Sequence, residues 1–136
     1  MSVDPVAAEI LRRFRHVAVV GLSPRPERDS HRVARYLVSV GYDVVPVNPA
    51  VDEVLGRRCW PNLTAAPGPI EVVDVFRRSE LVAPVVDEAI AVGAKAVWMQ
   101  DGVVDEAAAA RARAAGLLVV MDRCMLRDHA AMGTSG

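Results

Sequence analysis

The chain has 136 residues, of which 52% are hydrophobic, and this composition supplies a core and argues against intrinsic disorder. The formal net charge is −1, from 16 basic and 17 acidic residues, so no excess charge favours nucleic acid or an anionic membrane as a partner. No apolar run approaches the ~20 residues of a membrane span, and no signal peptide is visible at the N-terminus. We therefore expect a single cytoplasmic domain over residues 1–136 that binds neither nucleic acid nor membrane.

Short apolar runs rich in β-branched residues recur along the chain and predict buried strands. These runs cover 17–20, 44–47, 70–76, 96–99 and 117–121. The segment 57–60 is expected to add a short strand at one edge of the sheet. Each run is followed by glycine, proline or polar residues, which fits strands that end in loops.

Apolar residues at helical spacing predict helices between these strands. Residues that favour a helix start stand at the head of three of them: Asp4 before Pro5, Ser30 and Ser79. An alanine-rich helix is expected over 105–115. A last helix is expected over 123–132, followed by a frayed segment at 133–136, and a single helical turn is expected at 51–55.

The regular alternation of strands and helices predicts an α/β fold, a Rossmann-like doubly wound parallel sheet with helices on both faces. With strands counted along the chain and 57–60 taken as the third, the expected strand order is 3-2-1-4-5-6. In such a sheet a ligand binds beyond the carboxyl ends of the strands, where the order reverses. The candidate site residues are those after Val20, Val47, Val75 and Met99.

The turn after the first strand, Gly21-Leu22-Ser23-Pro24, predicts a binding site for phosphate. Gly21 allows the backbone to approach an anion, the Ser23 hydroxyl can donate to a phosphate oxygen, and the helix near Ser30 points its positive end at the same place. The loop also carries three arginines, which are Arg25, Arg28 and Arg32. A cofactor with several phosphates suits these charges, and the alternative is a solvated loop surface.

This turn is not the dinucleotide fingerprint, because the second and third glycines of GxGxxG are absent. After the second strand the chain reads Asn48-Pro49, where an NAD-binding domain usually carries an acid for the ribose hydroxyls. Both departures weigh against NAD.

The fourth strand ends in Val75-Phe76-Arg77-Arg78, where Phe76 could cover a flat base. Arg77 and Arg78 precede a helix start, where the helix dipole disfavours cations, so their placement fits a bound anion. The alternative is a pair of arginines that simply reach into water. Gln100, after the fifth strand, offers a polar side chain at the mouth of the same crevice.

Six segments of the chain together resemble the stand-alone CoA-binding domain family, which is similar to the N-terminal CoA-binding domain of the succinyl-CoA synthetase α subunit. These segments are 19–24, 30–37, 46–49, 73–78, 96–100 and 121–124. They occur in the family's order, and the resemblance extends from about residue 10 to residue 132. The loop of 21–30 carries fewer glycines than the synthetase loop, and the synthetase's phosphorylated histidine belongs to a further domain, so ligase activity is not implied.

The resemblance implies a domain that holds coenzyme A, or an acyl-CoA, across the strand ends. It places Gly21 and Ser23 at the diphosphate, Asn48 and Pro49 by the adenosine, and Gln100 by the thiol-bearing arm. The full set of expected cofactor-binding residues is Gly21, Leu22, Ser23, Pro24, Arg28, Ser30, Asn48, Pro49, Val75, Phe76, Arg77, Arg78 and Gln100. The expected function is CoA binding without catalysis, by a carrier, a sensor or a subunit that works with a protein partner or as a homo-oligomer.

Two alternatives remain open at this point. One is an NAD(P)-dependent or CoA-linked enzyme component, although no nucleophile–base pair and no metal-ligand spacing can be assembled from these residues. The other is a redox module in which Cys124, after the last strand, forms a mixed disulfide with CoA. Against the second stands the reading of Cys124 as a small buried hydrophobic residue. The other cysteine, Cys59, forms no CxxC pair with it, and both are expected to be reduced.

Overall fold

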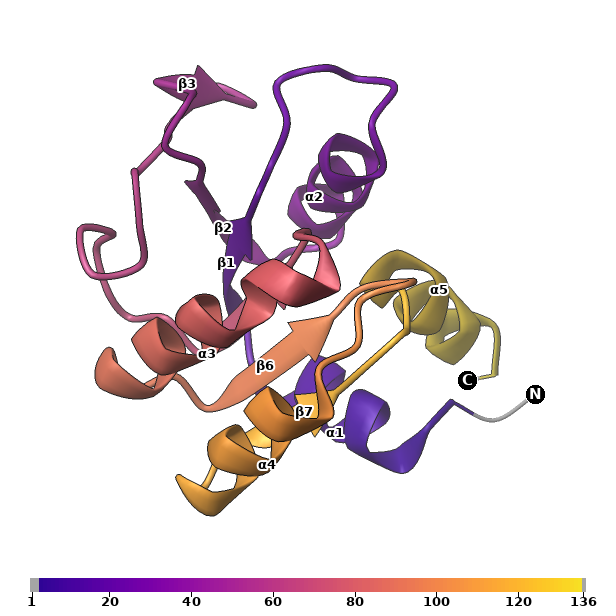
Figure 1. Ribbon diagram of the computed structural model, residues 1–136. Coiled ribbons are helices and arrows are strands. Elements are labelled where there is room, and N and C mark those ends of the chain that lie inside the picture. Colours follow the sequence, from indigo (N-terminus) through magenta and orange to yellow (C-terminus); the bar gives the residue numbers. More distant parts are fainter. Residues whose placement is uncertain (1–2, 136) are drawn as a thin grey trace.

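The computed structural model describes residues 3–135, and these build a five-stranded parallel sheet (Figure 1). In chain order its strands are β1 His16–Val20, β2 Asp43–Val47, β5 Val72–Val75, β6 Ala96–Met99 and β7 Leu118–Val120. They lie in the order β2-β1-β5-β6-β7. The sheet order reverses between β1 and β5, so the Rossmann-like α/β class is confirmed.

Helices cover both faces of the sheet, as the apolar strands require. They are α1 Pro5–Arg13, α2 Asp29–Ser39, α3 Val82–Ala91, α4 Glu106–Ala114 and α5 Met125–Ser135, with a short 3-10 helix, η1 Ser79–Leu81, before α3. One buried cluster joins α3 and α4 to one face of the sheet, and a second joins α1, α2 and α5 to the other. Figure 1 shows α3 and α4 together on the near side of β6.

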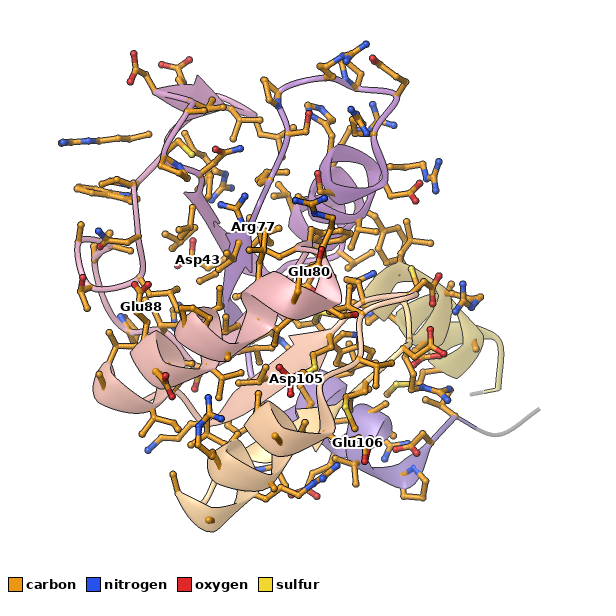
Figure 2. All side chains as sticks on the ribbon, in the orientation of Figure 1. Asp43, Arg77, Glu80, Glu88, Asp105 and Glu106 are labelled. Carbon is orange, nitrogen blue, oxygen red and sulfur yellow. The ribbon has the colours of Figure 1, made fainter. Side chains whose placement is uncertain are left out.

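Two helix starts are capped by an aspartate, and the cap at Asp4 confirms the prediction. Asp4 Oδ1 accepts hydrogen bonds from the backbone N–H groups of Val6 and Ala7, at 2.9 and 3.1 Å. Asp105, at the start of α4 (Figure 2), accepts from the N–H of Ala108 at 3.0 Å. Each aspartate therefore satisfies donors that a helix start leaves without partners inside the helix.

The two predicted serine caps are wrong. Helix α2 follows Arg28 and η1 follows Arg78, and neither start has a side-chain cap. Ser30 lies inside α2, and Ser79 Oγ accepts a hydrogen bond from the distant N–H of Val104 at 3.0 Å. Both serines have partners elsewhere in the fold, which the local sequence does not show.

The segment 51–60 differs from the prediction. Instead of a helical turn, β3 Glu53–Val54 and β4 Arg57–Arg58 form an antiparallel hairpin. Its two turn residues, Leu55 and Gly56, have φ of 55° and 69°, the left-handed pair that tight hairpins use. The hairpin takes 57–58 away from the main sheet, so the expected edge strand is reduced to one parallel bridge between Val47 and Trp60.

Helix α5 continues to Ser135, into the segment 133–136 that was expected to be frayed, and residue 136 lies outside the described residues. Within 3–135, no helix is long and apolar enough to cross a membrane.

Asp74, in the middle strand β5, is a charged residue type in an apolar place. It stands in register with Val19 and Trp98 and is fully buried. Neither of its carboxyl oxygens has a hydrogen-bond partner. Burial without a partner raises the pKa of Asp74 well above its ordinary value, which favours the neutral acid.

Candidate functional site

Gly21, directly after β1, is required by packing. Its N–H donates to the carbonyl of Val47 at 2.8 Å, and the N–H of Phe76 donates to the carbonyl of Val20 at 2.9 Å. These bonds bring the turn against the backbone of Phe76, so a Cβ on Gly21 would collide with the Phe76 carbonyl oxygen. Gly21 also has a φ of +87°, which L side chains rarely adopt. Its own N–H is used within the sheet and is not free for a ligand.

The loop that follows is held by its own hydrogen bonds. Ser30 Oγ accepts from the N–H of Ser23 at 2.9 Å, and Ser23 Oγ accepts from the N–H of Arg25 at 3.1 Å. His31 Nδ1 lies 3.0 Å from the Ser23 carbonyl oxygen, which can only accept, so this ring nitrogen donates. Both serine hydroxyls act as acceptors here, and each keeps its own proton to donate to a ligand. The loop is thus ordered before any ligand arrives.

Asn48, expected beside the adenosine, supports this loop instead of lining the cleft. Its Nδ2 donates to the carbonyl of Leu22 at 3.0 Å, and its Oδ1 accepts from the N–H of Ala50 at 3.0 Å. Both ends of the amide are therefore occupied by the protein.

A cleft of about 790 Å³ lies beyond the carboxyl ends of β1, β5 and β6, where the sheet order reverses. Among the predicted site residues, those that line it are Gly21, Ser23, Arg28, Ser30, Phe76, Arg77, Arg78 and Gln100. The others do not: Leu22, Pro24, Asn48, Pro49 and Val75. Leu22 and Val75 are fully buried in the core. The cleft therefore lies where the topology predicts it, with a narrower set of side chains.

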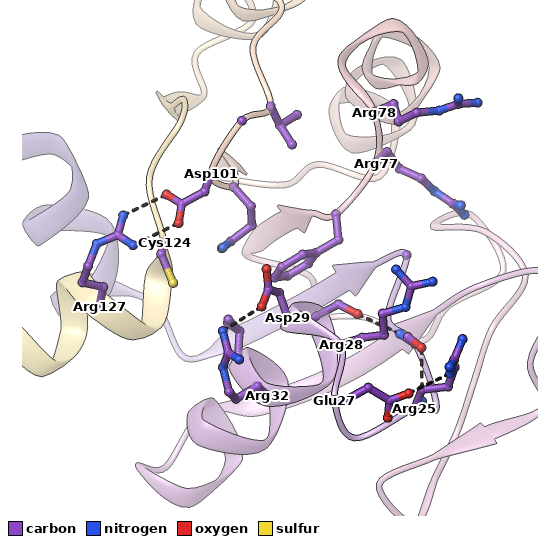
Figure 3. A pocket seen from close by; sticks show the side chains of 18 residues that line it. Arg25, Glu27, Arg28, Asp29, Arg32, Arg77, Arg78, Asp101, Cys124 and Arg127 are labelled. Atoms are coloured by element: carbon purple, nitrogen blue, oxygen red, sulfur yellow. Dashed lines mark hydrogen bonds and ion pairs between the residues drawn. The ribbon is translucent and has the colours of Figure 1, made fainter.

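Three arginines of the cleft each have an acidic partner within 3 Å. Arg25 pairs with Glu27 at 2.8 Å, Arg32 with Asp29 at 2.7 Å and Arg127 with Asp101 at 2.8 Å, as the dashed lines in Figure 3 show. Their charges are partly neutralised before a ligand binds.

Arg28 and Arg77 differ from these three. In the part of the chain that the structure describes, neither guanidinium has an ion pair or hydrogen bond with another side chain. Arg77 is half-buried, whereas its neighbour Arg78 is exposed and lies 3.4 Å from Glu80. Figure 3 shows Arg28 and Arg77 on the same side of the cleft, with Arg78 extending away. The unmatched positive charge is therefore concentrated at this end.

The opposite end of the cleft is formed by the loop after β6 and by the start of α5. Arg127 donates two hydrogen bonds to Asp101, at 2.9 and 2.8 Å. These bonds lower the pKa of Asp101 below its ordinary value, and they raise the pKa of Arg127. Cys124 lies beside this pair (Figure 3).

Hydrogen bonds to the sheet and to α5 hold the loop that carries Cys124. Trp98, fully buried in β6, donates from Nε1 to the carbonyl of Arg123 at 2.8 Å. Arg123 in turn donates two hydrogen bonds to Asp128, at 2.7 and 3.0 Å. This geometry holds the start of α5 at a defined position against the sheet.

Sequence reasoning missed the contribution of α5 to the cleft, namely Arg127 with its partner Asp101. A signal existed, because Arg127 lies three residues after Cys124 and so shares a helix face with it. Among residues 3–135 there is no group of three or more His, Cys, Asp or Glu side chains that could hold a metal ion.

The fold and the cleft together define a Rossmann-like domain with a cleft at the reversal of strand order, the place where ligands bind in sheets of this class. The chain belongs to the CoA binding domain family, whose sequence pattern matches residues 15–130. The family membership inferred from the six sequence segments is thereby confirmed.

Three similar proteins place this membership in context. The uncharacterized protein YneT of Bacillus subtilis is 43% identical over 122 residues, which is 90% of each chain. A hypothetical protein from Pyrococcus horikoshii OT3 is 47% identical, with a TM-score of 0.89 over 92% of this chain and 88% of the other. The dinucleotide forming acetyl-coenzyme A synthetase 1 of Ca. Korarchaeum cryptofilum is 27% identical, with a TM-score of 0.73, and matches 82% of this chain but 27% of its own. The chain thus resembles two proteins along most of their length and about a quarter of a larger synthetase.

Proposed function

We propose that this protein binds coenzyme A, free or acylated, in the cleft at the carboxyl ends of β1, β5 and β6, and that it binds without catalysing a reaction. The observation that carries the proposal is the pair of arginines without acidic partners, Arg28 and Arg77, on one side of the cleft. CoA brings a diphosphate and a further phosphate on its ribose, and charge-assisted hydrogen bonds from guanidinium groups suit these anions.

The helix starts support the same assignment. Both α2 and η1, which leads into α3, begin at the cleft without a side-chain cap. The first N–H groups of a helix have no partner within it, and a phosphate can take the place of the missing cap. The hydroxyl protons of Ser23 and Ser30 add two donors at the same end.

The other end of the cleft suits the less charged part of CoA. There the positive charge of Arg127 is matched by Asp101, and the lining includes Val103 and the half-buried ring of Phe76. We assign the phosphates to the end with Arg28 and Arg77, and the pantetheine arm to the end with Gln100 and Cys124.

Isothermal titration with four ligands tests this function: CoA, dephospho-CoA, ATP and NAD. We expect CoA to bind most tightly, dephospho-CoA more weakly because one phosphate is missing, and ATP and NAD more weakly than either because they lack the pantetheine arm. Binding of NAD without binding of CoA would reject the proposal and favour the NAD-dependent alternative.

A further inference from the structure

Cys124 occupies a particular position in the cleft. It stands at the start of α5, where its carbonyl accepts the first helical hydrogen bond from the N–H of Asp128 at 2.9 Å. The residue is half-buried, and it lines the cleft at the end away from Arg28 and Arg77 (Figure 3). Its backbone is held through the neighbouring Arg123, so the sulfur is presented from an ordered segment.

A second feature at this end points to a ligand. Gln100 is only 4% exposed, yet it lines the same cleft. Its Oε1 accepts a hydrogen bond from the N–H of Met125 at 3.3 Å, which fixes the orientation of the amide. Within 3–135 the amide NH₂ group of Gln100 donates to no protein acceptor. An amide NH₂ group that lines a cleft and has no protein acceptor is suited to a ligand carbonyl such as the amides of a pantetheine arm.

We propose that Cys124 is a site of thiol–disulfide exchange with disulfides of coenzyme A. The inference rests on the proposed function, because the phosphates must be held at the arginine end for the sulfur of the ligand to reach Cys124. Gln100, next to the start of α5, would hold the arm in place.

The reaction needs no reagent besides the incoming disulfide. The Cys124 thiol loses its proton to solvent, and its thiolate attacks the CoA sulfur of a disulfide between CoA and a small thiol. One S–S bond forms between Cys124 and CoA while the original S–S bond breaks. The small thiol leaves as a thiolate and takes up a proton, so the incoming disulfide is reduced as the protein thiol is oxidised.

Cys59 provides the comparison within the chain. It is 7% exposed, its Sγ lies 3.6 Å from the Asn48 carbonyl oxygen, and burial raises the pKa of its thiol. It does not line the cleft. A disulfide in solution has little access to Cys59, because that residue is buried. A disulfide that is bound in the cleft lies beside Cys124.

The test treats reduced protein with the mixed disulfide of CoA and 2-mercaptoethanol and follows intact mass over time. We expect one CoA adduct on the wild type and on Cys59→Ser, and none on Cys124→Ser. The phosphate-free disulfide of 2-mercaptoethanol should react at least about tenfold more slowly, since binding raises the effective concentration of the reacting sulfur. Arg77→Ala should remove this advantage.

Three results would overturn the inference: a CoA adduct on Cys59, equal rates with both disulfides, or no adduct. Titration of the reduced wild type with CoA separates this failure from failure of the proposed function. If CoA binds and no adduct forms, the exchange reaction is rejected and the binding function stands. If CoA does not bind, both are rejected.

Discussion

Four of the helix starts in this protein fall into two kinds. Helices α1 and α4 begin with an aspartate, Asp4 or Asp105, that caps the helix, and neither start lines the cleft. Helix α2 and the η1–α3 segment begin after an arginine, Arg28 or Arg78, without a side-chain cap, and both starts line the cleft. Arginine is a poor residue for that position in the free protein, because the helix dipole repels it. The difference supports the proposal that phosphate groups of a ligand bind at these two starts.

Arg28→Asp is expected to have the largest effect, because it converts one kind of start into the other. The new carboxylate can cap α2, whose preceding residue already has the extended backbone of a cap, and should raise stability by about 0.5–1 kcal/mol. It also replaces a phosphate partner with a repelling charge, so CoA affinity should fall about 100-fold or more. Thermal unfolding and calorimetric titration measure the two changes. If stability and CoA affinity both rose, or both fell, the contrast between capped starts and ligand-binding starts would be contradicted.

Arg77→Ala is expected to weaken CoA binding by about 1–3 kcal/mol, through loss of a charge-assisted hydrogen bond. The matched control is Arg78→Ala, which removes the neighbouring arginine. Arg78 is exposed and lies near Glu80, so its removal should cost clearly less affinity. Titration with CoA measures the affinity of both variants. Equal losses of affinity would show that the nearby Glu80 does not make Arg78 less important than Arg77.

Asp74 is a charged residue type that lacks a partner in the core, whereas Arg28 and Arg77 lack acidic partners at the cleft. Because Asp74 does not line the cleft, its effect should be on stability alone. Its pKa is raised in the folded state, so above the ordinary value of 3.8 the unfolded chain releases a proton that the folded protein keeps. This group therefore lowers stability progressively as the pH rises from 3.8 toward the folded-state pKa. Asp74→Asn should be more stable than the wild type at pH 7, with a smaller difference at pH 4. Denaturant unfolding at both pH values measures this, and a gain of the same size at both would reject the explanation.

Asp105→Ala should lower stability and leave CoA affinity unchanged, whereas the arginine variants lower CoA affinity. Loss of the cap on α4 should lower stability by about 1 kcal/mol, because the N–H of Ala108 loses its acceptor. CoA affinity should stay the same, since Asp105 does not line the cleft. A substantial change in affinity would mean that the capped starts also contribute to the site.

The smallest expected effect concerns His129 in α5, whose Nδ1 lies 2.7 Å from the Tyr36 hydroxyl. Burial, together with the charge of Arg15, lowers the pKa of His129. The unfolded chain therefore binds a proton more readily, and stability falls as the pH drops below 6.5 through the lowered pKa. His129→Gln should show a weaker loss of stability between pH 7 and pH 5. Thermal unfolding across that range measures it, and identical pH profiles would assign the loss to other groups.

The sheet and most of the helices could be predicted because their signals are local. Apolar β-branched runs predicted the five parallel strands, the Asp4 cap marked α1, and an alanine-rich run marked α4. The errors concern residues whose partners are distant in sequence. The hydroxyl of Ser79 meets the backbone of Val104, and the hairpin at 53–58 depends on Leu55 adopting a left-handed conformation that its residue type disfavours.

The same limit applies to the candidate site. The turn at Gly21 and the arginines at the end of β5 were predicted from strand ends, and they lie at the cleft. The distinction between Arg77 and Arg78 could not be predicted, because it depends on the burial of one side chain and on the position of Glu80. The role of α5 depends on its packing beside the sheet, through contacts such as that of Trp98 with Arg123.

A crystal structure of the protein with CoA tests the proposed site most directly. We expect phosphate oxygens of CoA within hydrogen-bonding distance of the Arg28 and Arg77 guanidinium groups, and the pantetheine arm running toward Gln100 and Cys124. CoA bound outside this cleft, or bound within it with its phosphates away from both arginines, would contradict the proposed mode of binding.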